Sequence, residues 1–311
     1  MEENIYHKIV YELAKEKNIE VKELSYGWIL ELKKDGKIRH IIGNKYDLNN
    51  EAMANIACDK YATYEVLKNN DIPVIAHKIL FSPDERSKYV PEDGNDKRIE
   101  KFFYENGEKI VVKANDSSKG EDVYLCEDIE YFKEKVKLLF KENPTLSMCP
   151  FYDIEKEYRL FYLDGEILLV YGKNKPFIIG NGKDSARTII ENEGVDIKII
   201  EDNKDNIDID YIPNEGEKYE ISWKHNLSLG AYPEILEDGE LKDCLIDIAK
   251  RAGKAMNITF ATIDIIKTRD NQIRILEINS SVCMRKFIER TENGYEIAKE
   301  IYGKALDKLW E

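Results

Sequence analysis

The stretch that most constrains the fold is residues 260–281, where two β-rich runs flank the pair Asp270-Asn271. An Asp-Asn pair favours a tight turn, so this stretch predicts a β-hairpin. In a hairpin centred on that pair, Asp264 faces Glu277 directly, and Asn279 follows two residues later on the same face. The opposite face would then carry the apolar side chains that point to the core, namely Ile263, Ile265, Leu276 and Ile278.

Two carboxylates at opposed positions of a strand pair repel each other, so the polar face of this hairpin needs a partner. A hard divalent cation would remove the repulsion, and Asp, Glu and Asn side chains supply the oxygen ligands that Mg²⁺ prefers. Asp264, Glu277 and Asn279 are therefore candidate metal ligands. The alternative is a solvated polar face on which two acids meet by accident in an acidic chain.

Lys113 is a second candidate site residue. It ends the apolar run 110–113 and precedes the polar stretch 115–120. A lysine in that place can contact a phosphate while the amides of the following loop cradle the other oxygens. The Walker pattern GxxxxGK[ST] is absent, and a surface lysine before a turn is the alternative. Together with the carboxylate pair, Lys113 points to magnesium-nucleotide chemistry.

Charge and cysteine usage disfavour several classes of protein. The 311 residues include 47 Lys and Arg against 61 Asp and Glu, a net charge of −14. This balance argues against general binding to nucleic acid or to anionic membranes. No apolar run approaches the ~20 residues of a membrane span, and the N-terminus lacks a signal-peptide pattern. Scattered cysteines without CxxC predict reduced thiols in the cytoplasm, and the scattered histidines argue against a histidine metal site.

Periodicity along the chain predicts an α+β protein with several hairpins, because strands and helices do not alternate as in a doubly wound sheet. A hairpin is expected over residues 157–171, with Asp164-Gly165 at its turn. We expect helices at residues 5–14, 59–69, 129–140, 241–252 and 297–309. Short strands are expected at residues 28–31, 38–42, 110–113 and 123–126, with irregular structure at residues 81–96 and 194–220.

The order and spacing of these motifs resemble the ATP-grasp superfamily over nearly the whole chain. Residues 59–63 (DKYAT) and 71–74 (DIPV) are similar to the family's first lysine, its helix and the entry strand. Residues 112–116 (VKAND) resemble the second lysine before the loop that closes over ATP phosphates. Glu157-Tyr158-Arg159 resembles the acid and arginine after the adenine-binding hinge, and the hairpin residues match the family's magnesium ligands. Stretches 47–50, 179–183, 225–230 and 277–285 are most similar to cyanophycin synthetase and the ATP-grasp module of bifunctional glutathione synthetases.

This resemblance implies the ATP-grasp fold, in which two α+β subdomains clasp ATP behind a short N-terminal α/β region. The expected boundaries are residues 1–55 for that region, 56–150 for the small lid subdomain with its linker helix, and 151–311 for the metal- and substrate-binding subdomain. The implied function is an ADP-forming carboxylate–amine ligase that makes an amide or peptide bond through an acyl phosphate. A peptide-modifying ligase of a natural-product pathway and a non-catalytic nucleotide-binding protein are the alternatives.

The resemblance also implies a role for each site residue. The ATP-binding residues would be Lys60, Lys113, Ser117, Ser118, Lys119, Gly120 and Glu157, with Arg159 and Asn226 near the transferred phosphoryl group. Two Mg²⁺ ions, or Mn²⁺ in their place, would bind Asp264, Glu277 and Asn279, with Glu277 shared between them. Lys173, Lys224 and Arg285 would bind the amino-acid or peptide substrate. Lys173 could equally be a solvated hairpin lysine, and Arg285 could equally be a surface residue of a helix end; a homodimer is compatible with the family.

The sequence departs from the family pattern at three places: the phosphate loop, the hinge and the turn after the metal ligands. The phosphate loop has one glycine, Gly120, where relatives have several. The hinge at residues 148–152 lacks the expected acid pair, so no side chain there can be assigned to adenine. The usual glycine-containing turn after the metal ligands is replaced by residues 280–284 (SSVCM). Because that turn shapes the acceptor site in relatives, the substrate stays open; the short N-terminal region favours a small acid and a small amine.

Overall fold

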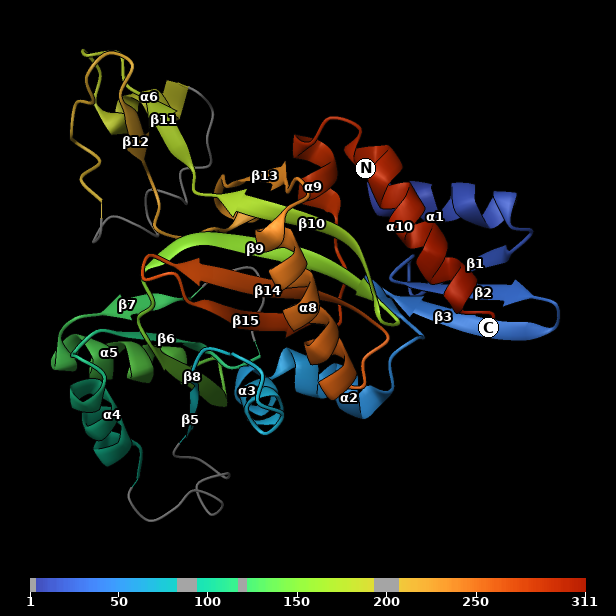
Figure 1. Ribbon diagram of the computed structural model, residues 1–311, viewed down its shortest axis with the longest axis horizontal. Helices are drawn as coiled ribbons and strands as arrows, with labels where there is room; N and C mark the ends of the chain where they lie inside the picture. Colours follow the sequence, from blue (N-terminus) through green and yellow to red (C-terminus); the bar gives the residue numbers. More distant parts are fainter. Residues whose placement is uncertain (1–3, 83–93, 117–121, 193–206) are drawn as a thin grey trace.

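The computed structural model describes residues 4–82, 94–116, 122–192 and 207–311. Its centre is a five-stranded antiparallel sheet with the order β13-β10-β9-β14-β15. These strands are β13 (Tyr232–Ile235), β10 (Glu166–Asn174), β9 (Ile154–Leu163), β14 (Phe260–Thr268) and β15 (Ile273–Asn279). Helix α8 (Glu240–Ala255) crosses one face of this sheet (Figure 1) and buries its apolar stripe there. The opposite face is left for the site.

The predicted β14–β15 hairpin is confirmed, with Asp264 paired to Glu277. A β-bulge follows immediately, because the register shifts by one residue between Asp264 and Ile265. The predicted core side chains Ile263, Ile265 and Ile278 are fully buried, but the prediction for Leu276 is wrong. The bulge turns Ile275 into the core and leaves Leu276 partly buried in a separate apolar cluster on the other face.

The β9–β10 hairpin is also confirmed, and its turn has the expected backbone. Asp164 and Gly165 have φ values of 44° and 90°, the left-handed pair that a type I′ turn requires. This turn fixes the register in which Arg159 pairs with Tyr171 and Glu157 pairs with Lys173. This hairpin and the β9–β14 pairing set the relative positions of four charged side chains of the site: Glu157, Arg159, Lys173 and Asp264.

A second antiparallel sheet, with the order β5-β8-β6-β7, lies beside the first (Figure 1). It contains β5 (Lys78–Phe81), β8 (Thr145–Pro150), β6 (Ile110–Ala114) and β7 (Tyr124–Cys126), and it packs against α4 (Gly94–Glu105) and α5 (Ile129–Leu139). Helices α2 (Glu51–Cys58) and α3 (Lys60–Lys68) contact β15 of the central sheet. Helix α3 begins as predicted, with the Asp59 side chain accepting the Ala62 N–H.

The N-terminal and C-terminal regions share one hydrophobic core. Helix α1 (Ile5–Glu16) precedes the four-stranded antiparallel sheet of β1 (Glu20–Leu24), β2 (Ile29–Lys34), β3 (Lys37–Ile42) and β4 (Lys45–Tyr46). Helix α10 (Gly294–Lys308), which follows α9 (Arg285–Arg290), lies against α1 (Figure 1). Residues of α1, this sheet and α10 form a single buried cluster that reaches the central sheet through Phe161 and Phe260. The predicted domain boundaries stay a prediction.

A small lobe stands away from the central sheet (Figure 1). It consists of β11 (Phe177–Ile179) paired with β12 (Lys218–Glu220), together with α6 (Ala186–Asn192). Its own core contains Ile178, Ile189, Ile190 and Ile221. The irregular structure expected at 194–220 is therefore wrong for residues 218–220, and α4 begins at Gly94, inside the loop expected at 81–96.

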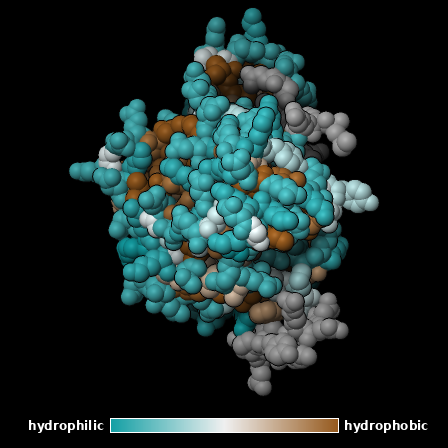
Figure 2. Space-filling view, turned by 90° about the vertical axis from the view of Figure 1, so that its right-hand side faces the viewer, coloured by the Kyte–Doolittle hydropathy of each residue, from teal (hydrophilic) through white to brown (hydrophobic). Residues whose placement is uncertain are grey.

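The surface is mostly hydrophilic, as the high charge content requires. Figure 2 shows this on the side that carries the N-terminal sheet, where apolar patches interrupt a polar surface. The large exposed apolar side chains of that sheet and its turns are Tyr26, Trp28, Ile38 and Ile42. In the described part of the chain, no helix has the length and apolar character needed to cross a membrane.

We predict that Asn49→Ala lowers the free energy of unfolding by about 2–3 kcal/mol. Its Nδ2 donates to the Phe260 carbonyl at 2.7 Å, and its Oδ1 accepts the N–H groups of Thr259 and Phe260 at 2.8 and 3.0 Å. The side chain thus joins the N-terminal region to β14. Asn50→Ala is the control, because Asn50 only caps α2 through Met53 and should cost about 1 kcal/mol. Equal losses in urea denaturation would contradict this role of Asn49.

Candidate active site

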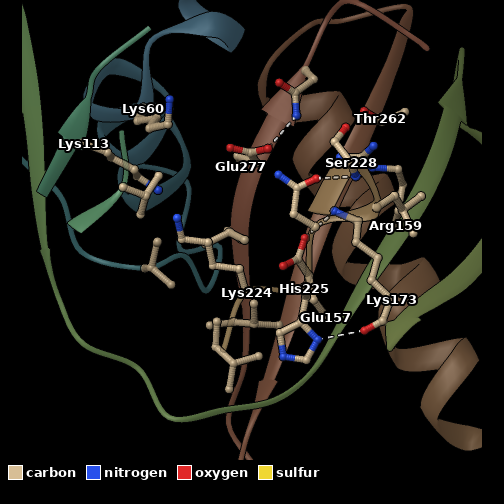
Figure 3. A pocket seen from close by; sticks show the side chains of 18 of the residues that line it. Lys60, Lys113, Glu157, Arg159, Lys173, Lys224, His225, Ser228, Thr262 and Glu277 are labelled. Carbon is tan, nitrogen blue, oxygen red and sulfur yellow. Dashed lines mark hydrogen bonds and ion pairs between the residues drawn. The ribbon is translucent and has the colours of Figure 1, made fainter. Parts of the chain in front are cut away.

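A cavity of about 650 Å³ lies between the central sheet and the β5–β8–β6–β7 sheet (Figure 3). Most of the site residues expected from the sequence line it: Lys60, Lys113, Glu157, Arg159, Lys173, Lys224, Asn226, Glu277, Asn279 and Arg285. Asp264 is fully buried behind this lining. Ser117, Ser118, Lys119 and Gly120 lie outside the described residues. The fold therefore brings together side chains that are up to 225 positions apart in the sequence, from Lys60 to Arg285.

Two lysines stand on one wall of the cavity (Figure 3). Lys60 is the first residue of α3, Lys113 lies near the end of β6, and each is only 8% exposed. The Lys60 ammonium donates to the Asn115 carbonyl at 3.1 Å. Burial and the neighbouring Lys113 charge lower the pKa of Lys60 to about 8. Two neighbouring cations that repel each other on one wall form a favourable place for an anion.

Glu277 and Asn279 stand on the opposite wall, on β15. The Asn279 amide donates to Glu277 Oε1 at 3.0 Å, and the Glu277 carboxylate has no ion pair within the described residues. Figure 3 shows Glu277 directed into the cavity, on the side that faces Lys60 and Lys113. The Glu277 charge acts on Lys60 by raising its pKa, against the larger effect of burial. Cations and oxygen ligands thus face each other across the space.

Four charged side chains form a network on the strands next to Glu277: Glu157, Lys173 and Asp264, which are buried, and Arg159, which is partly buried. Arg159 binds Asp264 with two hydrogen bonds, from Nε to Oδ1 at 2.7 Å and from Nη2 to Oδ2 at 2.6 Å. The Lys173 ammonium donates to Asp264 Oδ2 at 2.8 Å and also to Glu157. Strand register explains the Arg159–Asp264 and Lys173–Glu157 contacts, since these residues are paired across neighbouring strands. Lys173 is only 4% exposed, so the alternative of a solvated lysine is wrong.

The network shifts the two carboxyl groups in opposite directions. Burial tends to raise the pKa of Asp264, but Arg159 and Lys173 outweigh it and hold that pKa well below its usual range. Burial raises the pKa of Glu157 to about 7, with Lys173 opposing the change and Asp264 adding to it. Asp264 therefore stays ionised at neutral pH, whereas Glu157 is partly protonated there.

Lys224, Asn226 and Arg285 also line the cavity. The Asn226 side chain accepts the Ser228 N–H at 2.8 Å and so caps the short helix η2 (Leu227–Leu229). Arg285 begins α9, is largely exposed, and pairs with Glu289 at 2.8 Å while it lines the cavity. Both expectations for Arg285, a helix-end residue and a cavity residue, describe its position.

The hairpin fits a magnesium site that is completed by a ligand. No three His, Cys, Asp or Glu side chains cluster as a metal site within residues 4–82, 94–116, 122–192 and 207–311. Mg²⁺ usually takes one or two protein carboxylates and completes its shell with phosphate oxygens and water. Glu277 and Asn279 present oxygens to the cavity, whereas three donors already occupy Asp264. Only the first two are open to an ion in this arrangement.

Sequence reasoning missed the apolar end of the cavity. Val111, Cys149, Phe151, Trp223, Ile266 and Leu276 line it and belong to one apolar cluster. The sequence signal for it was the continuous apolar run of β6, whose residues are all buried. Ile110 and Val112 pack against α4 and α5, whereas Val111 faces the cavity cluster. Cavity residues Asn44, His225 and Lys286 were also unassigned. Burial lowers the pKa of His225 to about 4, and its Nδ1 lies 2.8 Å from the Lys173 carbonyl, so it is a neutral donor.

A family model and several curated proteins match parts of the chain. The family model of the RimK-like ATP-grasp domain matches residues 187–304. The chain is 29% identical over 161 residues to the uncharacterized protein MG011 homolog of Mycoplasma pneumoniae, covering 51% of this chain and 46% of that protein. It is 21% identical over 282 residues to cyanophycin synthetase of Trichormus variabilis, covering 82% and 29%. The chain thus spans less than half the length of these curated relatives.

Solved structures share the fold at low sequence identity. A bifunctional glutathione synthetase from Pasteurella multocida has a TM-score of 0.56 and 17% identity, covering 96% of this chain and 44% of that one. D-alanine–D-alanine ligase from Bacillus anthracis has a TM-score of 0.55 and 15% identity, covering 85% and 69%. The ATP-grasp ligase PsnB with a precursor variant, Mg and ADP has a TM-score of 0.50 and 14% identity, covering 82% and 60%. The chain is thus similar to the RimK-like ATP-grasp domain over residues 187–304, and its fold is similar to the folds of these ligases.

Proposed function

We propose that the chain is an ATP-dependent carboxylate–amine ligase that forms an amide or peptide bond on an amino acid or small peptide. The observation that carries this proposal is the single cavity in which Lys60 and Lys113 face Glu277 and Asn279. Phosphoryl transfer needs positioning and charge neutralisation more than covalent chemistry from the protein, and this arrangement supplies both. The superfamily's solved ligases support the same reaction class by fold.

ATP would occupy the cavity from its apolar end toward its cationic wall. The adenine ring would lie among the apolar side chains beside Trp223, since aromatic and aliphatic surfaces suit a flat base. The phosphates would lie between Lys60 and Lys113, because anionic oxygens relieve the repulsion of these ammonium groups. Glu157 would contact the nucleotide, and Ser117, Ser118, Lys119 and Gly120 stay proposed as the phosphate loop.

Glu277 and Asn279 would hold Mg²⁺ against the phosphates, with Asp264 completing the set when Arg159 or Lys173 leaves an oxygen open. Two ions sharing Glu277, or Mn²⁺ in their place, would neutralise phosphate charge and orient the terminal phosphoryl group. Arg159 lines the cavity while Asp264 fixes its guanidinium, so it is placed to contact phosphoryl oxygens. Asn226 stays the second residue proposed for that role.

The reaction would consume one ATP per bond formed. A substrate carboxylate oxygen attacks the γ-phosphorus, and ADP leaves as the acyl phosphate forms. An amine nitrogen then attacks the acyl carbon, phosphate leaves, and the amine loses a proton. Lys224 and Arg285 would bind the acid substrate, since their positive charges compensate the carboxylate. Lys173 stays proposed with them, and would exchange an ion pair with Glu157 or Asp264 for the substrate. Cytoplasmic location and a homodimer stay predictions.

An ADP-release screen over amino acids and dipeptides, with mass spectrometry of the product, tests this function. ADP release that depends on an acid and an amine, with a product lighter by one water than the two together, would support it. Release only with a longer peptide would favour the peptide-modifying ligase. ATP binding without turnover on any acceptor would favour the non-catalytic protein and overturn the proposal.

We predict that Glu277→Gln lowers kcat by at least about 100-fold, because it removes the charge that would hold magnesium at the phosphates. The variant should fold normally, since Glu277 forms no ion pair within the described residues. Glu220→Gln, at an exposed carboxylate paired with Lys175, is the control and should keep full activity. Near-normal ADP release by Glu277→Gln at saturating magnesium would remove this residue from the metal site.

We predict that ATP affinity falls about tenfold between pH 7 and pH 9.5, because the Lys60 ammonium loses its proton as pH rises through about 8. The charged form binds phosphate, so affinity is greatest below that pH. Lys60→Arg keeps its charge over this range and should flatten the profile, whereas Lys68→Arg, exposed on the same helix, should not. Calorimetric titrations that give the same profile for all three proteins would contradict the role of Lys60.

We predict that Arg285→Met raises KM for the acid substrate about tenfold while KM for ATP stays the same. Glu289 competes for the Arg285 guanidinium, so Glu289→Gln should leave acid affinity unchanged or strengthen it. Steady-state kinetics with each substrate varied in turn measures both effects. If Arg285→Met leaves both KM values unchanged, the acid must be bound elsewhere, around Arg159 and Lys224.

A further inference from the structure

Residues 280–284, which replace the family's glycine-containing turn, alternate between core and cavity. Ser280, Val282 and Met284 are at most 2% exposed, whereas Ser281 and Cys283 line the cavity. The two sets alternate along one short stretch of backbone, so their positions are linked. Whatever holds the buried residues also determines where the cavity-facing residues lie.

Three parts of the chain hold the buried residues in place. The Tyr302 hydroxyl, on α10, donates to the Val282 carbonyl at 3.0 Å and accepts the Met284 N–H at 3.0 Å. The Val282 N–H donates to the Asn44 carbonyl at 3.0 Å, and Ser280 Oγ donates to the Ala54 carbonyl at 3.2 Å. Buried backbone groups need partners, and one phenol supplies two of them.

We propose that Tyr302 is a positioning residue for the non-nucleotide substrate, an inference that rests on the proposed ligase function. Its hydroxyl fixes the backbone on both sides of Cys283 and immediately before Arg285. Through these contacts it sets the wall of the cavity that lies beyond the metal ligands. Tyr302 itself does not line the cavity, so it acts only through residues 280–284.

The hydroxyl of Tyr302 can be separated from its ring. The ring packs edge-on against Tyr6, with centroids 5.0 Å apart, and is stacked with Tyr46 at 6.2 Å. Phenylalanine keeps this packing and loses only the two hydrogen bonds. Tyr46 offers a matched control, because it is also buried in this aromatic group but its hydroxyl forms no bond to residues 280–284.

The residues proposed to bind ATP lie on other elements. Lys60 belongs to α3 and Lys113 to β6, and neither contacts the Tyr302 hydroxyl. Loss of that hydroxyl should therefore loosen the acceptor wall and leave the ATP end of the cavity as it is. A merely structural role would weaken both ends together, which gives the experiment its readout.

The test compares Tyr302→Phe with Tyr46→Phe and wild type in ADP-release kinetics, with the acid, the amine and ATP varied in turn. We expect Tyr302→Phe to raise KM for the acid or the amine on the order of tenfold, with KM for ATP within about twofold. Tyr46→Phe should match wild type. Hydrogen–deuterium exchange should be faster across residues 281–286 in Tyr302→Phe alone.

Each outcome decides between the two proposals. Unchanged kinetics or unchanged exchange in Tyr302→Phe, with an active wild type, would overturn this inference and leave the ligase function standing. Equal increases in KM for ATP and for the acid would make Tyr302 purely structural and would also overturn it. A wild type that releases no ADP with any acid and amine would overturn the ligase function, and this inference with it.

Discussion

The site depends on keeping Asp264 charged in the interior of a sheet. A buried carboxylate is costly unless cations and hydrogen bonds compensate it, and here three donors from two neighbouring strands do so. Those donors, on Arg159 and Lys173, reach Asp264 because β9, β10 and β14 are adjacent in a fixed register. With Glu157, the group contains two positive and two negative side chains. Removal of any one member would leave the network with an uncompensated charge, and removal of Asp264 would leave Arg159 without its carboxylate partner.

This compensation also decides which carboxylate remains for chemistry. Asp264 is occupied, so the negative charge that reaches the cavity is that of Glu277, directly across the strand pair. On the other wall stand the two lysines, where burial and, after it, the Lys113 charge lower the pKa of Lys60. The cavity thus has a cationic wall and an anionic wall, and its apolar end is formed largely by strands of the same two sheets. A ligand that joins a polyanion to a flat apolar group matches the charged walls and the apolar end of this cavity.

The parts of the fold that could be predicted from the sequence are those governed by local chemistry. Turn pairs such as Asp164-Gly165 and the cap Asp59 located hairpins and helix starts. The facing of Asp264 with Glu277 was predicted from a hairpin centred on Asp270-Asn271, but the β-bulge produces it, since nearer the turn Ile265 pairs with Ile275. Leu276 was misplaced because a bulge is decided by packing between strands and leaves no local signal. The contacts of Arg159 and Lys173 with Asp264 depend on which strands become neighbours. Strand order is a property of the whole sheet. The family resemblance therefore gave roles to Arg159 and Lys173 but did not indicate that both bind Asp264.

The core shared by α1, the N-terminal sheet and α10 has a consequence for synthesis on the ribosome. The apolar faces of α1 and of the sheet are made early, but their packing partner spans residues 294–308. Until that helix, which begins at Gly294, is translated, the early segment that ends at Tyr46 exposes apolar surface that the finished protein buries. Its native contacts are among the most distant in the chain, and forming them is slow because a long loop must close. This early segment is therefore the part of the nascent chain that most needs protection from aggregation.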